Sequence, residues 1–471
     1  MNRVLALVER LRDRFGERAV VTDRDAIAPW LTDWRGRWTG AAEALLQPGS
    51  TEDVAAMVAA AREAGVALVP QGGNTSMVGG ATPPADGSAL ILSLRRMNRI
   101  RAIEPASRSA LAEAGVILQT LHEAANHEGL RFPLTLGARG SATIGGLVST
   151  NAGGTQVLRF GTMRGLVQGI EAVLPDGTVH DGLSGLKKDN RGTSLDQLLI
   201  GAEGTLGIVT AARLRLVPAV AARAVAWLGL ASPHAALDTL RALEAATDRI
   251  EGFELVPDES LQAALSEIEG TRAPLAGAHA WHVLVEATAA SPAEEAPEAL
   301  LERLLAPLLA SGLVEDATIA ASESQAEAFW RIRDSLSEAE KKAFGPATQH
   351  DLSVPVERMP TFLAEASAAV EAAFPGTRAS GFGHLGDGNI HFHVRAMARG
   401  RPGWIDHEGP AVTRLVDDLV TAAGGSISAE HGIGQMKRDE LARLDPARVA
   451  TLKAIRAALD PGGLMNPGKL T

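Results

Sequence analysis

The chain has 471 residues, of which 46% are hydrophobic and 21% charged, and these proportions are ordinary for a soluble globular protein of about three domains. It contains no cysteine, which excludes disulfides, thiolate metal sites and cysteine nucleophiles, so any metal must use His, Asp or Glu. The net charge of −11 argues against a nucleic-acid binder, and no apolar run reaches the ~18 residues that a membrane span needs.

The N-terminal region is predicted to alternate helices with short strands. Its first stretch favours an amphipathic helix, with Val4, Leu5, Val8 and Leu11 on the apolar face, over a signal peptide, and we expect a cytoplasmic protein. The pattern then predicts a helix over 50–65, strands over 66–70, 88–94 and 109–116, a helix over 117–129, a hairpin over 165–182 and a strand over 204–218.

The rest of the chain has a different pattern. Strands over 224–231, 281–288 and 388–396 and helices over 233–247, 291–312 and 447–458 are expected. Because strands and helices alternate here with few glycine-rich loops, the region is typical of an α+β domain with an antiparallel sheet. The predicted domains are 1–218, 219–420 and a small C-terminal segment, 421–471.

Two glycine-rich loops, over 71–80 and 136–154, mark the N-terminal region. Glycine lets backbone N–H groups approach an anion closely. From Gly129 to Ile170 there is no acid, although 56 acids in 471 residues would place about five there, and Arg131, Arg139, Arg159 and Arg164 all lie in this stretch. The pattern favours loops that accommodate a polyanion over ordinary tight turns. Neither loop leads from a strand into a helix as an NAD site requires.

Residues 381–394 contain both a G-x-G-x-x-G and three histidines. A phosphate site needs a following helix, whereas a strand is predicted here. Residues two apart on a strand share a face, so His391 and His393 would point the same way, and the turn can fold His384 back beside His391. Imidazoles and a carboxylate from Glu430, next to His431, suit a catalytic divalent ion. Histidines satisfied within the core are the alternative, and the residues by themselves leave both open.

Six motifs in register give the chain a resemblance to a known family. They are VPQGGNTSMVGG, LGARGSATIGGLVSTNAGG, GAEGTLGIV, GHLGDGNIH, SAEHGIG and LDPGGLMNPGK. Together they resemble the FAD-linked D-2-hydroxyacid dehydrogenases of the vanillyl-alcohol oxidase flavoprotein superfamily, from about residue 20 to 469. The resemblance implies a two-subdomain FAD-binding domain of that type in residues 1–218, followed by a substrate and metal domain.

The resemblance also implies which residues bind FAD, because both glycine loops wrap the pyrophosphate in that family. The FAD-binding positions are Gln71, Gly72, Gly73, Asn74, Thr75, Gly137, Ser141, Gly145, Gly146, Asn151, Gly153, Glu203, Gly207, Ile208 and Asn466. Several members of the superfamily tether FAD through a His after the Gly-Gly pair or through a Cys. This chain has Asn74 at that place and no Cys, so non-covalent FAD is predicted.

The metal and the catalytic residues are implied in the same way. His384, His391 and Glu430 match the metal ligands of the family, for Zn²⁺ or Mn²⁺, and His431 matches its catalytic base. Arg333 matches the arginine that holds the substrate carboxylate. The implied activity is oxidation of a D-2-hydroxyacid of the D-2-hydroxyglutarate, D-malate or D-lactate class by hydride transfer to flavin N5.

Three further positions, which we assign to substrate binding, depart from the family. Gln349 replaces a common Lys, Ser337 replaces a Thr, and His393 replaces an Asn. The missing lysine puts a second substrate carboxylate in doubt more than the reaction itself. The electron acceptor is open among an electron-transfer flavoprotein, a cytochrome and a quinone, and a homodimer is one alternative for the oligomeric state. The alternative function is a non-catalytic flavin-binding subunit of a multi-protein glycolate or lactate oxidase.

Overall fold

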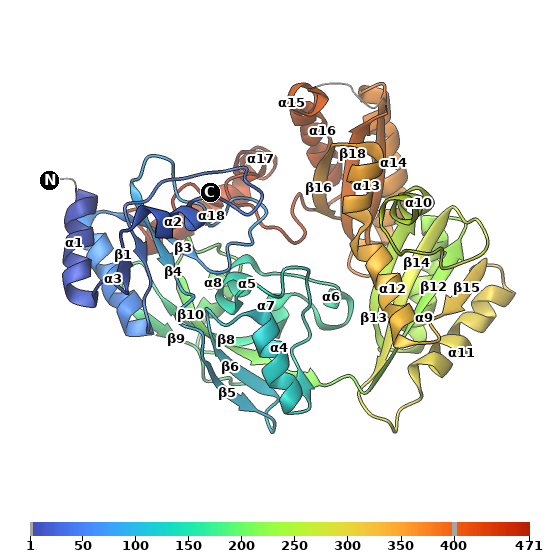
Figure 1. Ribbon diagram of the computed structural model, residues 1–471, viewed down its shortest axis with the longest axis horizontal. Helices are drawn as coiled ribbons and strands as arrows, with labels where there is room; N and C mark the ends of the chain where they lie inside the picture. The colour runs from blue at the N-terminus through green and yellow to red at the C-terminus, as the bar shows by residue number, and fades with distance from the viewer. Residues whose placement is uncertain (1–2, 398–402) are drawn as a thin grey trace. The chain divides into compact units, whose positions relative to one another are not determined.

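The computed structural model describes residues 3–397 and 403–471, and the chain divides into two compact units. The first unit consists of Met1–Gly154, Phe160–Ala219 and Glu430–Thr471, and the second of Thr155–Arg159 and Val220–Ala429. In Figure 1 the first unit runs from blue to green and resumes in red, because the end of the chain returns to the unit in which it began.

Two sheets form the framework of the first unit. The smaller has the strand order β1 (Val20–Val21), β2 (Leu45–Leu46), β4 (Ala89–Ser93), β3 (Ala67–Gln71). The larger has the order β5 (Ile100–Glu104), β6 (Ser109–Glu113), β10 (Ile208–Arg215), β8 (Val167–Val173), β9 (Val179–Asp181), and β7 (Leu130–Arg131) pairs with β11 (Val217–Pro218). The C-terminal segment joins the smaller sheet through a parallel bridge between Leu68 and Met465.

The helices of the first unit surround these sheets in the chain order α1 (Arg3–Phe15), α2 (Arg24–Leu31), α3 (Thr51–Ala64), α4 (Leu118–His127), α5 (Ile144–Thr150), α7 (Met163–Leu166), α8 (Leu195–Leu199), α17 (Arg438–Leu444) and α18 (Pro446–Leu459). The short helix α6 (Val157–Phe160) belongs mostly to the second unit, because the chain crosses between the units there. The predicted helix over 50–65 is confirmed as α3: the Ser50 side chain accepts from the Asp53 N–H, and Gly65 ends the helix with a left-handed φ of 62°.

One side chain of the predicted N-terminal helix was assigned to the wrong face. Leu5 is 42% exposed, whereas Leu7 is buried with Val4, Val8 and Leu11. At 100° per residue, positions 4, 7, 8 and 11 share a stripe and position 5 turns away from it.

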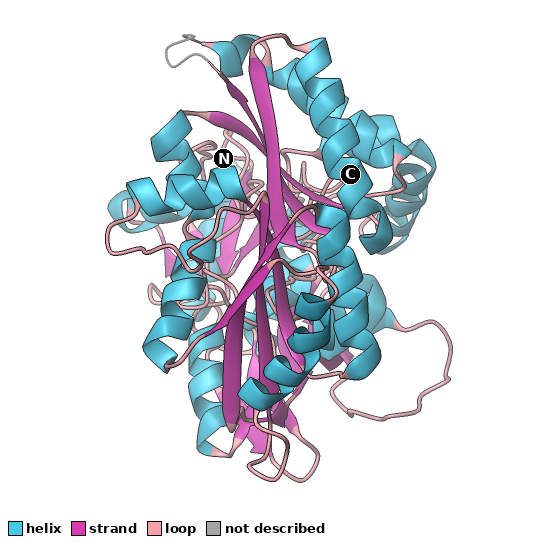
Figure 2. Ribbon diagram, turned by 90° about the vertical axis from the view of Figure 1, so that its right-hand side faces the viewer, coloured by secondary structure: helices cyan, strands magenta, loops and turns pink. Residues whose placement is uncertain are grey.

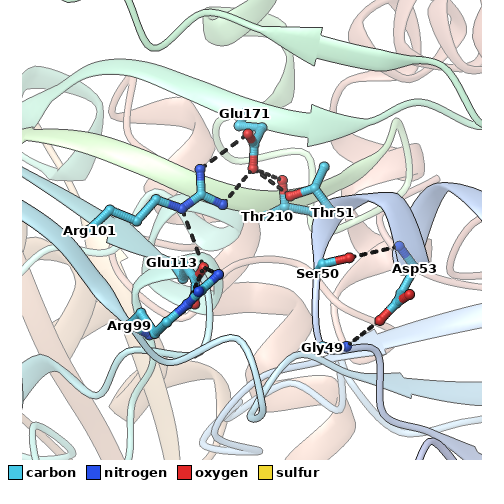
Figure 3. A network of polar contacts seen from close by, with 9 residues as sticks. All are labelled: Gly49, Ser50, Thr51, Asp53, Arg99, Arg101, Glu113, Glu171 and Thr210. Carbon is cyan, nitrogen blue, oxygen red and sulfur yellow. Dashed lines mark hydrogen bonds and ion pairs between the residues drawn. The ribbon is translucent and has the colours of Figure 1, made fainter.

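A network of charged and hydroxyl side chains ties helix α3 to the larger sheet (Figure 3). Glu171 on β8 accepts hydrogen bonds from Thr51 at the start of α3 (2.6 Å) and from Thr210 on β10 (2.8 Å). Arg101 on β5 also bonds Glu171 (3.0 Å) and reaches Glu113 on β6 (3.3 Å). Burial would raise the pKa of Glu171, but the bonds from Arg101, Thr51 and Thr210 outweigh it and lower the pKa.

The second unit is built on one antiparallel sheet. Its strand order is β15 (Asp316–Ile319), β12 (Ala222–Leu230), β14 (Trp281–Ala289), β13 (Ile250–Pro257), β17 (Thr377–His384), β18 (Asn389–Ala396), β16 (Ala347–Ser353). The predicted α+β class with an antiparallel sheet is therefore confirmed.

Helices cover this sheet, as the view in Figure 2 shows around its long strands. On one face lie α10 (Asp258–Glu267), α12 (Glu323–Asp334) and α13 (Leu336–Phe344), whose apolar residues form a core with Trp227, Leu284 and Phe382 of the strands. The remaining helices are α9 (Pro233–Ala246), α11 (Pro297–Ala310), α14 (Met359–Ala373), α15 (Trp404–His407) and α16 (Gly409–Ala422), with a 3₁₀ turn over Val356–Arg358. Within the described residues, no helix has the length and apolarity to cross a bilayer.

The Glu171 network generates a stability prediction. Glu171→Ala removes a carboxylate that accepts from three side chains, so the variant should lose about 2 kcal/mol of unfolding free energy at pH 7. Because folding lowers the pKa of Glu171 below its ordinary 4.5, this contribution is present in full above that value and disappears as the pH falls through the lower folded pKa.

Urea unfolding of both proteins between pH 3 and pH 8 measures this difference. The control is Glu128→Ala, because Glu128 is exposed on the same unit, and its effect should stay within about 0.5 kcal/mol at every pH. A difference for Glu171→Ala that is as large at pH 3 as at pH 7 contradicts the prediction.

Candidate active site

A large cavity lies in the first unit, between the glycine loops and the C-terminal segment. Its volume is about 720 Å³, within the range of sites for cofactors and drug-sized ligands. Fourteen of the fifteen predicted FAD-binding residues line it, together with Glu430 and His431. The exception is Asn151, which ends α5 with a φ of 50° and whose side-chain oxygen accepts from Thr162 Oγ1 (3.0 Å) and the Arg164 N–H (2.9 Å).

The two glycine loops touch each other where they form the cavity wall. A Cβ on Gly72 would lie 2.2 Å from Thr143 Oγ1, and a Cβ on Gly73 would lie 2.0 Å from the Ser141 carbonyl oxygen. Neither position can therefore carry a side chain unless the backbone moves. The wall is bare backbone at this point, which is what close approach to a pyrophosphate requires.

Unpaired polar atoms indicate what this cavity fits. Gln71 Oε1, Thr143 Oγ1 and Asn466 Oδ1 are buried without a hydrogen-bond partner, and all three residues line the cavity. The amide nitrogens are already used, since Gln71 donates to the Trp30 and Ala81 carbonyls and Asn466 to those of Gly80 and Glu203. Buried acceptors on a mostly apolar wall fit a large aromatic cofactor with N–H and O–H donors, as FAD has.

Three of the four arginines in the acid-free stretch have structural partners. Arg131 stacks over the Phe160 ring at 5.3 Å, Arg159 pairs with Glu251 at 2.6 Å, and Arg164 donates to the Gln197 carbonyl at 2.7 Å. The glycine loops thus offer backbone to an anion, while these guanidinium groups hold the surrounding fold.

Glu203 holds the C-terminal segment against the cavity. Its buried carboxylate accepts from the N–H groups of Ile433 (2.7 Å) and Gly434 (2.8 Å). Burial raises the pKa of Glu203, and these two bonds partly offset the rise. Glu203, Asn74 and Asn466 line the cavity with φ values of 51°, 55° and 42°, a conformation that costs free energy and clusters at functional sites.

In the second unit, strand pairing gathers polar side chains on one face of the sheet. Cross-strand partners point to the same side, and so do residues two apart on one strand. Between β13 and β17, Glu254 is the partner of His384. Between β17 and β18, Phe382 is the partner of His391, and between β18 and β16, His391 is the partner of Asp351. The shared face carries Glu254, His384, His391, His393, Asp351 and Gln349 and is the one that α10, α12 and α13 cover.

A buried acid joins the predicted metal histidine to the predicted substrate arginine. Glu254 accepts from His384 Nδ1 (2.7 Å) and from Arg333 Nε (2.8 Å), and Arg333 Nη2 lies 2.8 Å from His384 Nε2. Burial would raise the pKa of Glu254, but the charges of Arg333 and His384 outweigh it and lower the pKa to about 2. A carboxylate on Nδ1 fixes the orientation of the ring, and the Nε2 lone pair faces the Arg333 guanidinium.

The turn after β17 brings two of the histidines together, as the sequence predicted. The chain reverses over 385–388, and the rings of His384 and His391 are 5.6 Å apart, nearly perpendicular. Asp351 beside them is buried and accepts from the Asn389 amide (2.9 Å). Its carbonyl accepts from the N–H of Ala429, and the next residue along the chain is Glu430.

The residues assigned to substrate binding differ in their surroundings. Ser337 on α13 and Gln349 on β16 are exposed. His393 is buried with its Nδ1 2.6 Å from Glu340 Oε2, and Gln349 is its cross-strand partner. Glu340 and Glu254 are not among the residues predicted from the sequence. Glu340 lies at a buried position of α13, and Glu254 lies in the otherwise apolar end of β13. An acid at a buried position is rare without a partner, and that is the signal that could have found them.

Comparisons with known proteins identify the families that the two parts of the chain match. Residues 42–182 match the family described as FAD binding domain, and residues 220–470 match FAD linked oxidases, C-terminal domain. D-2-hydroxyglutarate dehydrogenase, mitochondrial, of Arabidopsis thaliana is 35% identical over 98% of this chain and 81% of its own length. D-2-hydroxyglutarate dehydrogenase of Xanthomonas citri pv. viticola is 37% identical over 93% and 91%.

Solved structures share the fold at lower identity. The 4-ethylphenol oxidase of Gulosibacter chungangensis superposes with a TM-score of 0.71 at 20% identity, over 99% of this chain and 97% of that one. p-Cresol methylhydroxylase gives 0.72 at 15% identity, over 100% and 97%. The predicted FAD-binding architecture of the vanillyl-alcohol oxidase type is confirmed.

The contact between the glycine loops generates a matched pair of variants. Gly73→Ala places a methyl group against the Ser141 carbonyl and should cost tenfold or more in FAD affinity. Gly140→Ala, on the other loop, meets nothing within 4 Å and should keep full flavin. Flavin content after purification, released by hot acid into the supernatant, measures both. Equal flavin content in the two variants contradicts FAD binding against the glycine loops. Yellow colour retained in the protein pellet contradicts non-covalent attachment of FAD.

Proposed function

We propose that this chain, which belongs to the FAD-linked oxidases and within them to the family of the D-2-hydroxyglutarate dehydrogenases, oxidises a D-2-hydroxyacid to the 2-oxoacid. It is an FAD-dependent oxidoreductase. The observation that carries the proposal is the polar face of the second unit, where Arg333 and His384 are fixed side by side by one buried carboxylate. Membership of an enzyme family argues against the alternative of a non-catalytic subunit.

The substrate needs a cation for its carboxylate. Arg333 has its Nε and Nη2 on Glu254 and a side chain that is 11% exposed, so its position is set before substrate arrives. A guanidinium whose position is set in this way can receive a carboxylate with little further loss of side-chain entropy. We assign Arg333 to the carboxylate next to the reacting carbon, and Ser337, Gln349 and His393 to the rest of the substrate.

The donor set suits a divalent metal. His384 and His391 offer imidazoles and Glu430 a carboxylate, which is the ligand chemistry of catalytic Zn²⁺, with Mn²⁺ as the alternative. Glu254 on His384 Nδ1 is the outer-shell carboxylate that such histidines commonly have. A metal held by these residues would lower the pKa of the substrate hydroxyl.

The proton and the hydride that leave the substrate need two separate acceptors. His431, whose neighbouring N–H groups at Ile433 and Gly434 are held by Glu203, lines the cofactor cavity and is assigned as the base that takes the hydroxyl proton. Bound FAD supplies the hydride acceptor at its N5. The residues of the chain bind and orient the substrate and receive its proton.

Anaerobic reduction tests the reaction. D-2-Hydroxyglutarate, D-malate or D-lactate should bleach the flavin absorbance near ~450 nm, and the L-enantiomer of the same acid should not, because hydride transfer requires one face of the reacting carbon. Arg333→Lys should lower kcat/KM by about a hundredfold or more, because Lys cannot form the paired bonds that fix Arg333. The proposal is wrong if no D-2-hydroxyacid bleaches the holoenzyme.

The metal assignment has its own test. His391→Ala and Glu430→Ala should lose bound metal and turnover while keeping FAD, since neither removes a glycine of the cofactor loops. Metal analysis and the flavin spectrum of the same sample measure this, with His407→Ala as the control on α15. Full metal content in His391→Ala would remove that residue from the ligand set.

A further inference from the structure

A short loop over 32–39 connects the cofactor cavity with the outer surface of the first unit. Trp34 in this loop lines the cavity and is nevertheless 60% exposed. Its indole N–H donates to Met77 Sδ at 3.0 Å, and Met77 is another lining residue. A large aromatic side chain therefore lies with one side towards the cofactor position and the other towards solvent.

The loop has a fixed conformation. Asp33 is buried, and its carboxylate accepts from the N–H groups of Arg35 (3.2 Å) and Trp38 (2.6 Å). Gly36 makes the turn with a φ of 67°. The Asn74 amide of the first glycine loop donates to the Thr32 carbonyl at 2.9 Å. The one acid of the loop is thus turned inward, and the loop is tied to the cofactor cavity.

The outward side of the loop is basic and apolar. Arg35 and Arg37 are exposed, and the Arg35 guanidinium lies 5.6 Å from the centre of the Trp34 ring. Arg37 lies 3.8 Å from the sulfur of Met436, which is 42% exposed. No acid occurs from residue 34 to 39, in a chain whose net charge is −11. The loop therefore places two positively charged side chains at the surface of a protein whose net charge is negative.

An electron acceptor must come to this cavity from outside. If the chain runs the proposed reaction, each turnover leaves reduced FAD, and the absence of cysteine excludes a disulfide or an iron–sulfur relay within the chain. Reduced FAD returns to its oxidised form by giving two electrons, one to each of two one-electron acceptor molecules, and releasing two protons.

We propose that Trp34, Arg35, Arg37 and Met436 form the docking surface for an electron-accepting protein with an acidic face. Trp, Arg and Met are the residue types enriched at the centres of protein interfaces, which selects a protein partner. The two arginines select a negatively charged one and would speed its approach. This inference rests on the proposed function for the supply of electrons, but the surface itself does not depend on which hydroxyacid is oxidised.

Reoxidation of chemically reduced holoenzyme tests the surface without any substrate. The FAD is reduced with dithionite and mixed with oxidised plastocyanin, which is acidic, with cytochrome c, which is basic, or with a neutral quinone. The test variant is Arg35→Glu/Arg37→Glu. The control is Arg14→Glu/Arg18→Glu, which changes the net charge equally at exposed positions on and just after α1.

The test variant should reduce plastocyanin at least about tenfold more slowly at low ionic strength, and the difference should close in high salt. Cytochrome c should react faster with the variant than with the parent, and the quinone should react equally with both. The control should follow the parent with all three. Similar rates for both double variants with plastocyanin overturn the proposal.

A binding measurement separates docking from electron transfer. Oxidised plastocyanin should bind the oxidised parent holoenzyme and the control in low-salt calorimetry, and binding to Arg35→Glu/Arg37→Glu should be lost. Equal binding to all three proteins, or to none, overturns the proposal. Failure of every D-2-hydroxyacid to bleach the flavin would instead count against the proposed function, because dithionite replaces substrate in the docking test.

Discussion

The buried carboxylate of Glu203 is the contact on which the cofactor cavity depends. It accepts from two backbone N–H groups of residues 433 and 434, and its own carbonyl accepts from the Asn466 amide. These bonds hold the C-terminal segment on the first unit, which the chain leaves after Ala219 and re-enters at Glu430. The strained φ values at Glu203, Asn74 and Asn466 indicate that the surrounding packing, and not local preference, sets the geometry of the wall.

In the second unit the corresponding constraint is the pleat of the sheet. Because side chains alternate between faces, a histidine on β17 and two on β18 must share one side with an acid on β13 and another on β16. The same side is covered by the helices that bring Arg333 and Glu340. Every buried histidine among these predicted site residues has a carboxylate on its Nδ1, Glu254 for His384 and Glu340 for His393. The pairing fixes each ring before any ligand arrives.

Acidic and basic side chains occupy different places in this protein. Acids are absent from the glycine loops, where backbone faces the cofactor cavity. Three of the four arginines of that stretch bind a carbonyl, a ring or an acid of the protein itself. Acids are instead buried where they orient a cation, as at Glu113 and Glu254. The exposed arginines at 35 and 37 belong to a loop whose own acid, Asp33, accepts from backbone N–H groups.

The sequence by itself determined the local elements and the family. Contacts within a few residues set the α3 cap, the hairpin turn at Gly177 and the shared face of His391 and His393. Six motifs in register identify the FAD-linked oxidases. The tertiary structure decided which distant residues meet: Glu254 with His384 and Arg333, Glu340 with His393, and Trp34 with the cavity wall. Those contacts join residues far apart in the chain, and their free energy comes from burial and strand register, which no local pattern encodes.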